Sequence, residues 1–133
     1  MKIINNIADL RKISEKIKKN KKKIVLCHGV FDILHIGHVL HFEQAKKMGD
    51  VLIVSITGDK FVNKGPNRPM FSDLLRAKFI SNLSIVDHVF INQEITSENI
   101  IHTIKPSLYV KGPDYKQNDK DLTGQILKEK KAL

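Results

Sequence analysis

Hydrophobic residues along this chain alternate between helical spacing and short continuous runs. Helical spacing predicts helices over about 7–19, 38–48 and 72–83, and a shorter helix from Thr96 or Ser97 to Ile104. Continuous apolar runs predict strands over 23–27, 51–57, 86–91 and 108–110. After the leading helix, strands and helices therefore follow each other in the order βαβαβαβ, with no internal repeat.

Each longer helix has an apolar face that we expect to be buried. The expected faces are Leu10, Ile13 and Ile17 in the first helix, Val39, Phe42 and Ala45 in the second, and Leu75, Phe79 and Leu83 in the third. Ser72 precedes the third helix and is its expected N-cap. Gly49 follows the second helix, where glycine commonly takes the left-handed C-terminal cap conformation.

The run 51–57 is apolar on both faces, which is typical of a parallel strand covered by helices on both sides. With right-handed crossovers, the predicted fold is an α/β, Rossmann-like, doubly wound parallel sheet with helices on both faces. Ligands of such sheets bind beyond the carboxyl ends of the strands, where the strand order reverses. The segments 29–38, 59–69 and 111–115 follow predicted strands, so we expect them to converge on one crevice.

The composition suits one domain of 133 residues with a single core, in which residues 1–20 form the leading helical segment. No run approaches the roughly eighteen apolar residues of a membrane span, and the first residues lack the apolar core of a signal peptide. We therefore expect a cytoplasmic protein without membrane contact. The single cysteine, Cys27, lies in an apolar run, which predicts a buried, unreactive thiol and excludes a disulfide framework.

The formal net charge of +9 indicates anionic partners. Only three of the 23 basic residues are arginines, and lysine is poorly suited to bidentate reading of bases. The densest basic run, 18–23, contains no aromatic residue for base stacking and is interpreted as a solvated connection. We expect no nucleic acid partner.

The segment with the clearest chemistry lies between the first predicted strand and the second predicted helix. It contains two histidines, His35 and His38, on either side of Gly37 at a helix start. Helix N-termini bind phosphate through free backbone N–H groups and the helix dipole, and a glycine there lets the backbone approach closely. If a phosphate attacks the α-phosphorus of a nucleoside triphosphate there, the two imidazoles are expected to donate hydrogen bonds to the α-phosphate oxygens and to the bridging oxygen as charge builds on them. The histidines would then act as electrophilic stabilisers and not as nucleophiles.

Residues 29–38 read Gly-Val-Phe-Asp-Ile-Leu-His-Ile-Gly-His and resemble the GxFDxxHxGH signature of cytidylyltransferase-like nucleotidyltransferases. This group includes glycerol-3-phosphate cytidylyltransferase and the adenylyltransferase domain of bifunctional heptose enzymes. The resemblance runs from about residue 21 to 115. It includes the stretches 45–50, 64–69, 86–87 and 110–115 and the residue Arg76, and it is closer to the heptose-type domain.

The resemblance implies a role for each matching position. The implied catalytic residues are His35, His38, Lys64 and Arg76, and the implied nucleotide-binding residues are Gly29, Val30, Phe31, Asp32, Gly37, Lys111, Gly112 and Asp114. For four of these residues, a structural or surface role without contact to substrate is an alternative. Asp32 can instead cap a turn, Lys64 and Arg76 can be surface charges, and Asp114 can pair with Lys111.

The resemblance also implies the reactants. They are a nucleoside triphosphate, CTP or ATP, and a phosphorylated small-molecule acceptor, with Mg²⁺ carried mainly by the triphosphate. A homodimer is expected. No protein metal site is expected, because His28, His41, His88 and His102 lack a second ligand at metal spacing and are interpreted as structural or solvated.

The chain departs from the family pattern in two places. The family's S-T-T-like motif near the C-terminus has no counterpart, and 122–126 aligns with the stretch before it, so residues 116–133 are interpreted as a truncated segment of a longer protein. In addition, Ser84 and Ile85 stand where glycerol phosphate enzymes carry an arginine, which argues against glycerol 3-phosphate as acceptor.

Two other functions compete with this interpretation. One is a non-catalytic nucleotide-binding module or domain of a longer protein. The other is a fragment of a class I aminoacyl-tRNA synthetase, because residues 35–38 spell that family's HIGH motif. The absence of a K-M-S-K-S-like loop makes the synthetase the weaker alternative.

Overall fold

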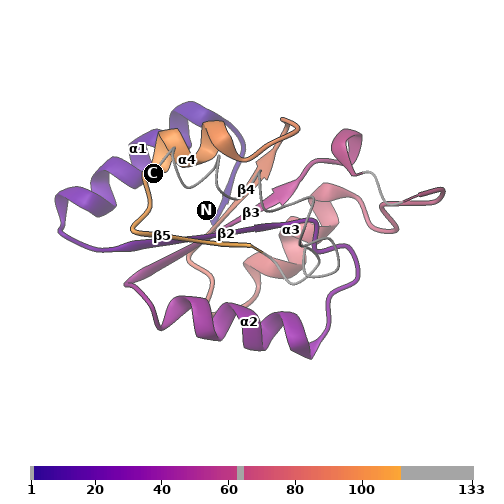
Figure 1. Cartoon of the computed structure of the whole chain (residues 1–133), viewed down its shortest axis with the longest axis horizontal. Helices are drawn as coiled ribbons and strands as arrows, with labels where there is room; N and C mark the ends of the chain where they lie inside the picture. Colours follow the sequence, from indigo (N-terminus) through magenta and orange to yellow (C-terminus); the bar gives the residue numbers. More distant parts are fainter. Residues whose placement is uncertain (1, 63–64, 112–133) are drawn as a thin grey trace, which may run out of the picture.

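The computed structural model describes residues 2–62 and 65–111, which form one parallel sheet with helices on both faces (Figure 1). The strands are β1 (Ile3–Ile4), β2 (Ile24–Gly29), β3 (Val51–Thr57), β4 (His88–Asn92) and β5 (Leu108–Lys111). The helices are α1 (Ile7–Lys19), α2 (Ile36–Lys46), α3 (Asp73–Ser81) and α4 (Glu98–Ile104), with a 3₁₀ turn η1 at Asp59–Phe61.

The strands lie in the order β1-β4-β3-β2-β5, and all four pairings are parallel. Helices α1 and α4 cover one face of the sheet, and α2 and α3 cover the other (Figure 1). The predicted doubly wound α/β fold is confirmed. The edge strand β1 was not predicted, because two residues are too few to show a strand period.

The core consists of two apolar layers, one on each face of the sheet. Every residue of β2 and β3 is buried, as expected of central parallel strands. Cys27 is fully buried, and burial raises the pKa of its thiol, which agrees with the predicted unreactive role. The basic run 18–23 is exposed throughout, as predicted.

Helix α3 begins as predicted but presents a different face to the core. Ser72 is its N-cap and accepts a hydrogen bond from the Leu75 backbone N–H at 3.2 Å. The expected buried residues Leu75 and Phe79 are 57% and 50% exposed, so that prediction was wrong. The buried residues are instead Arg76, Ala77 and Ile80. Hydrophobic periodicity predicts that a charged residue faces solvent. The Arg76 guanidinium is buried instead, because it donates hydrogen bonds to acceptors inside the protein.

Helix α2 also differs from the prediction at both ends. It begins at Ile36 with His35 as N-cap, and its buried face includes His38 beside Phe42 and Ala45. Gly49 does not adopt the predicted left-handed conformation, since Gly65 is the glycine with a positive φ in the described part of the chain. A side chain at Gly49 would instead collide with Val25, because its Cβ would lie 2.7 Å from Cγ2 of that residue.

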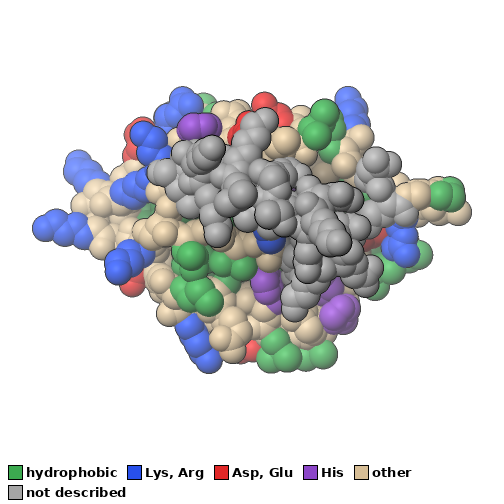
Figure 2. All heavy atoms as spheres, viewed as in Figure 1, with side chains coloured by type: hydrophobic (Ala, Val, Ile, Leu, Met, Phe, Trp, Pro, Cys, Tyr) green, Lys and Arg blue, Asp and Glu red, His purple; other side chains and the backbone are tan. Residues whose placement is uncertain are grey.

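Figure 2 shows lysine and arginine side chains around the rim of one face, several of them at the end where α1 lies. Within the described ranges, no helix is long and apolar enough to cross a membrane.

Candidate functional site

The carboxyl ends of three neighbouring strands meet at one edge of the sheet. Strand β2 pairs with β3 on one side and β5 on the other, and His28 is in register with both Ser55 and Lys111. After β2 the chain adds β3 and β4 on one side of β2, and it then crosses to add β5 on the other side of β2. The strand order therefore reverses at β2. The edge is therefore the binding position that the fold predicts.

Three predicted site residues cannot be placed at this edge. Lys64, Gly112 and Asp114 lie outside the described residues, as does 116–133. Lys111, the last residue of β5, is described, and its Nζ lies 5.5 Å from the centre of the Tyr109 ring.

The turn after β2 is shaped by Gly29 and Phe31. Phe31 has a φ of 52°, which is uncommon for a residue with a side chain, and its ring is fully buried. The ring contacts His38 and Phe42 edge-on, with centroid separations of 5.7 and 5.2 Å. A Cβ at Gly29 would lie 2.7 Å from Cζ of Phe31, so only glycine leaves room for this turn. The turn holds the Phe31 ring against His38.

The two histidines are oriented by backbone hydrogen bonds at the start of α2. The Gly37 N–H donates to Nδ1 of His35 at 3.0 Å, and the His35 N–H donates to Nδ1 of His38 at 3.2 Å. In the neutral form of each ring, an Nδ1 that accepts a hydrogen bond places the proton on Nε2. Each imidazole is thus set up as an Nε2–H donor.

The two rings lie together but differ in exposure. Their centroids are 4.3 Å apart, and His35 is exposed whereas His38 is 4% exposed. Gly37 makes this arrangement possible, because a Cβ there would lie 2.6 Å from Cε1 of His35. The structure therefore gives Gly37 a role in seating the His35 ring.

Asp32 is buried and holds the segment that follows Pro69. Its carboxylate accepts hydrogen bonds from the backbone N–H groups of Met70 at 2.8 Å and Phe71 at 2.9 Å, and from Arg68 at 3.1 Å. Burial raises the pKa of Asp32, but these hydrogen bonds outweigh burial and the net pKa is lowered. The carboxylate therefore fastens a distant loop rather than capping its own turn.

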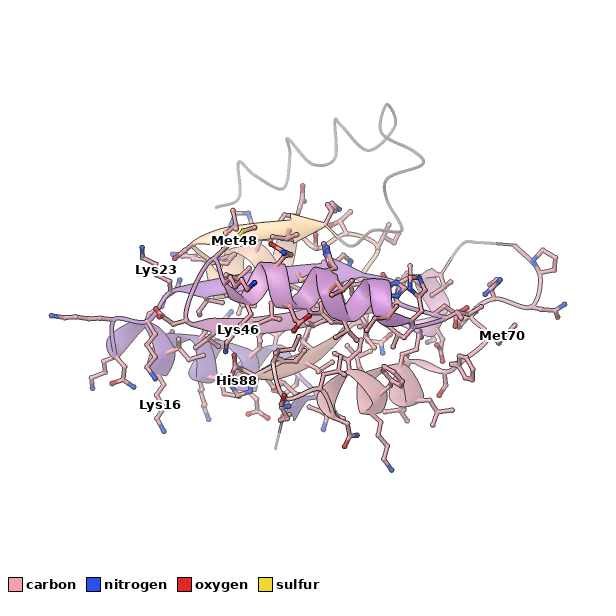
Figure 3. All side chains as sticks on the ribbon, turned by 90° about the horizontal axis from the view of Figure 1, so that it is seen from below. Lys16, Lys23, Lys46, Met48, Met70 and His88 are labelled. Carbon is pink, nitrogen blue, oxygen red and sulfur yellow. The ribbon has the colours of Figure 1, made fainter. Side chains whose placement is uncertain are left out.

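Figure 3 places that loop in the molecule. Met70 lies at one end of the molecule, and Lys23 and Met48 lie at the opposite end. Met48 comes just after the last residue of α2, so Met70 is at the end where α2 begins. The loop held by Asp32 and the histidine pair thus share one end of the fold.

Arg76 is the largest fully buried side chain in the described part of the chain, so the surface-charge alternative was wrong. One guanidinium nitrogen donates to the carbonyl oxygens of Val30 at 2.7 Å and Thr57 at 2.8 Å. Nε donates to the Phe71 carbonyl at 3.0 Å, and the other nitrogen pairs with Asp59 at 2.8 Å. Arg76 joins the ends of β2 and β3 to the loop before α3. Its predicted phosphate contact stays a prediction.

Sequence reasoning did not single out Asp59, and it interpreted His28 as structural or solvated, which agrees with the burial of His28 in β2. Asp59 pairs with Arg76 and also accepts from the Asp73 N–H at 2.8 Å; its place two residues after the end of β3 was the available signal. His28 Nδ1 lies 2.6 Å from Ser55 Oγ. Burial, with Lys111 adding to it, lowers the pKa of His28 to about 3 despite the opposing Ser55 hydrogen bond, so the ring is neutral.

Across 2–62 and 65–111, no group of three or more His, Cys, Asp or Glu side chains is arranged to hold a metal ion. The carboxylates that follow β2 and β3, Asp32 and Asp59, are engaged by Arg68 and Arg76.

Comparison with known proteins agrees with this geometry. The profile of the cytidylyltransferase-like family matches residues 26–132, which begins within β2. The chain belongs to the cytidylyltransferase-like family. Its fold and the resemblance noted from the sequence are thereby confirmed, and it is a nucleotidyltransferase domain at the level of the family.

Among cytidylyltransferase-like proteins, the chain is similar to bifunctional heptose enzymes. It is 40% identical over 133 residues to bifunctional protein HldE of Nitratiruptor sp., covering 98% of this chain and 28% of that protein. It is 44% identical over 113 residues to HldE of Campylobacter jejuni, covering 84% of this chain and 24% of that protein. The chain thus spans less than a third of the length of these relatives.

A solved structure covers most of this domain. The lipopolysaccharide core biosynthesis protein of Thermoplasma volcanium superimposes with a TM-score of 0.67 and 32% identity, covering 80% of this chain and 88% of the other. At that identity and coverage the similarity extends beyond the fold to the family.

Proposed function

We propose that this domain transfers a nucleoside monophosphate from CTP or ATP to a phosphorylated sugar or polyol and releases pyrophosphate. The observation that carries the proposal is the orientation of His35 and His38. Both rings accept a backbone N–H at Nδ1, and both therefore present an Nε2–H donor at the start of α2. Two such donors at a helix N-terminus suit an anionic phosphate.

The proposed reaction is a single displacement at phosphorus. A phosphate oxygen of the acceptor attacks the α-phosphorus, and the bond from that phosphorus to the bridging oxygen of the β-phosphate breaks. Pyrophosphate leaves with the bonding electron pair. The nucleophile is already an anion, so the enzyme supplies alignment and charge stabilisation. The Nε2–H donors are proposed to stabilise the α-phosphate oxygens and the bridging oxygen as charge builds there.

The nucleotide is proposed to lie over the ends of β2 and β5. The backbone of Val30 and Phe31 follows β2, and Lys111 ends β5 in the neighbouring strand. Gly112 and Asp114 are proposed to border the base, and Lys64 to contact acceptor or triphosphate phosphate. Arg76 is proposed to act as a positioning residue, because its guanidinium already joins the Val30 and Thr57 carbonyls.

Mg²⁺ is proposed to arrive with the triphosphate. Mg²⁺ prefers oxygen ligands and commonly keeps several waters and substrate phosphates around it. The donor set at the strand ends fits such a delivery, since Asp32 and Asp59 are held by arginines. When bound, the ion neutralises charge on the phosphates.

The acceptor class is proposed from the relatives. Two of them are named as bifunctional protein HldE, and a solved structure is titled a lipopolysaccharide core biosynthesis protein. A sugar phosphate acceptor, in a domain of a longer bifunctional protein, agrees with these names. A cytoplasmic location and a homodimer remain predictions.

A pyrophosphate-release screen tests the proposal. The protein is incubated with Mg²⁺ and either ATP or CTP against a panel of phosphorylated sugars and polyols. We expect release that requires both the triphosphate and one class of acceptor. Nucleotide binding without release in the full-length protein would favour the non-catalytic module instead.

A further inference from the structure

Lysines from two separate segments gather at the amino ends of the strands. One group lies in the last turns of α1 and in the turn before β2, and Lys105 follows α4. The Ser107 N–H donates to the Ile24 carbonyl at 2.9 Å, so the segment after α4 lies beside the start of β2. We call this group the basic end, and its members, all exposed, are Lys16, Lys18, Lys19, Lys21, Lys22, Lys23 and Lys105.

The basic end and the histidine pair lie at opposite ends of the fold. Lys23 directly precedes β2, and its carbonyl accepts the N–H groups of Asp50 at 2.9 Å and Val51 at 3.0 Å, where β3 begins. Figure 3 shows Lys16 and Lys23 at the end of the molecule opposite Met70, and Figure 2 shows basic side chains where α1 lies. The crevice at the carboxyl ends of the strands therefore faces away from the basic end.

The charge of the basic end is not neutralised within the part of the chain that the structure describes. Two acidic residues, Glu15 and Asp50, lie in the same segments, and Asp50 accepts from the backbone N–H of Lys23 at 2.7 Å. No ion pair joins the seven ammonium groups to a described carboxylate. Partial burial, with the charge of Lys105 adding to it, lowers the pKa of Lys18, so the two segments repel each other. An external anionic surface would relieve this repulsion.

The helix dipole explains only part of this group. Lysines in the last turn of a helix are stabilised by the negative end of its dipole, which applies to Lys16, Lys18 and Lys19. Lys21, Lys22 and Lys23 follow the helix and lie outside that turn. Their accumulation calls for a partner outside the helix.

The chemistry of the basic end suits a diffuse anionic surface rather than a base or a single phosphate. Lysine is a compact point charge without the planar fork of donors that arginine offers. Residues 16–23 include no aromatic side chain on which a base could stack. Met48 is 54% exposed and lies at the same end as Lys23 (Figure 3). An exposed apolar side chain beside lysines can enter the boundary between lipid headgroups and acyl chains, an environment that nucleic acid does not offer.

We infer that the basic end docks this domain onto a bilayer surface that carries anionic lipid headgroups. Each lysine within a Debye length of such a surface strengthens binding roughly fivefold, and salt weakens the attraction. The inference does not depend on the proposed function. Docking needs no spanning helix, and it revises the expectation of a protein without membrane contact, which rested on the lack of a long apolar run. The histidine crevice would then face solvent, open to soluble substrates.

Co-sedimentation of the full chain with vesicles tests the inference. We expect binding to vesicles that contain phosphatidylglycerol, no binding to phosphatidylcholine vesicles, and release as salt rises from roughly 0.1 to roughly 0.5 M. Lys19→Gln/Lys22→Gln should weaken vesicle binding roughly twentyfold, and Met48→Ser should weaken it by a smaller factor. The control Lys60→Gln/Lys78→Gln removes the same charge from exposed positions in η1 and α3 and should bind almost as the parent does.

Equal binding to neutral vesicles would overturn the inference, as would an equal loss of binding in the two double variants. A titration with single-stranded RNA tests the rival partner. RNA binding that was tighter than vesicle binding and equally dependent on Lys19 and Lys22 would assign the basic end to nucleic acid and overturn the lipid assignment. Because the replaced lysines are exposed, all variants should keep the parent's urea midpoint.

Discussion

The backbone N–H of His35 donates to Nδ1 of His38 at 3.2 Å, so one catalytic candidate orients the other. Nδ1 of His35 is itself held by the Gly37 N–H. Two backbone N–H groups at the start of α2 therefore fix the orientation of both rings and of their Nε2–H donors.

Removal of either imidazole should abolish most of the turnover. We expect His35→Ala and His38→Ala each to lower the rate of pyrophosphate release by at least roughly a hundredfold, because each loses a donor to developing charge. The measurement is steady-state pyrophosphate release at saturating triphosphate. His102→Ala is the matched control, since His102 is exposed on α4. Unchanged turnover in both variants would refute the mechanism.

Gly37→Ala should act through His35. The added methyl would lie 2.6 Å from Cε1 and 2.9 Å from Nδ1 of His35, so the exposed ring must move away. We expect a loss of turnover close to that of His35→Ala and little change in thermal stability. In the double variant, Gly37→Ala should add almost nothing to His35→Ala. Additive losses in this double-mutant cycle would show that Gly37 acts on the phosphate independently of His35.

Arg76→Met should destabilise the fold. It removes a buried cation that bonds to three carbonyls and Asp59, and leaves the Val30 and Thr57 carbonyls without their donor. We expect the free energy of unfolding to fall by about 3–5 kcal/mol, because several hydrogen bonds of a charged donor are lost and two buried carbonyls are left unsatisfied. Urea titration measures it. Arg11→Met, at an exposed position of α1, should change stability by less than about 0.5 kcal/mol.

A different result would change the assignment of Arg76. If Arg76→Met left the urea midpoint unchanged but lowered turnover, the guanidinium would act on phosphate rather than on the strand ends.

Asp32→Asn should lower stability near neutral pH and much less in acid. The Phe71 N–H donates to Oδ1, and Met70 and Arg68 donate to Oδ2. The amide keeps one acceptor oxygen, so its NH₂ group faces one of these two sets of donors. The folded pKa of Asp32 is lowered, so its stabilisation is present above the unfolded pKa of about 4 and is lost as pH falls through the folded pKa. We expect a difference of about 2 kcal/mol at pH 7.

Urea titrations of parent and Asp32→Asn at neutral and acid pH measure this dependence. Asp9→Asn, on exposed α1, is a control for general loss of acidic charge. A gap between parent and Asp32→Asn that widened on acidification would contradict the assigned pKa direction.

The sequence predicted the sheet well because its signals are local. The apolar run of β3 and the helical spacing of α1 were predicted with the boundaries that the structure has. The inward face of α3 was mispredicted because burial of Arg76 depends on carbonyls from β2 and β3, which are distant in the chain. The residue pattern of a single helix does not indicate hydrogen-bond acceptors on distant strands.

The candidate site divides in the same way. The histidine pair is apparent from a short segment, because the residues that orient it are its immediate neighbours. The function of Asp32 was not apparent, because its three donors lie 36 to 39 residues away.

The bonds of Arg76 have a consequence for ligand affinity. By holding the exits of β2 and β3 and the backbone before α3 together, this residue gives the crevice its shape before any substrate arrives. The entropy cost of ordering these segments then falls on folding and not on ligand binding. The free energy of the ligand contacts therefore contributes more fully to the affinity. Hydrogen exchange at the strand exits should accordingly be slow and should change little on addition of nucleotide.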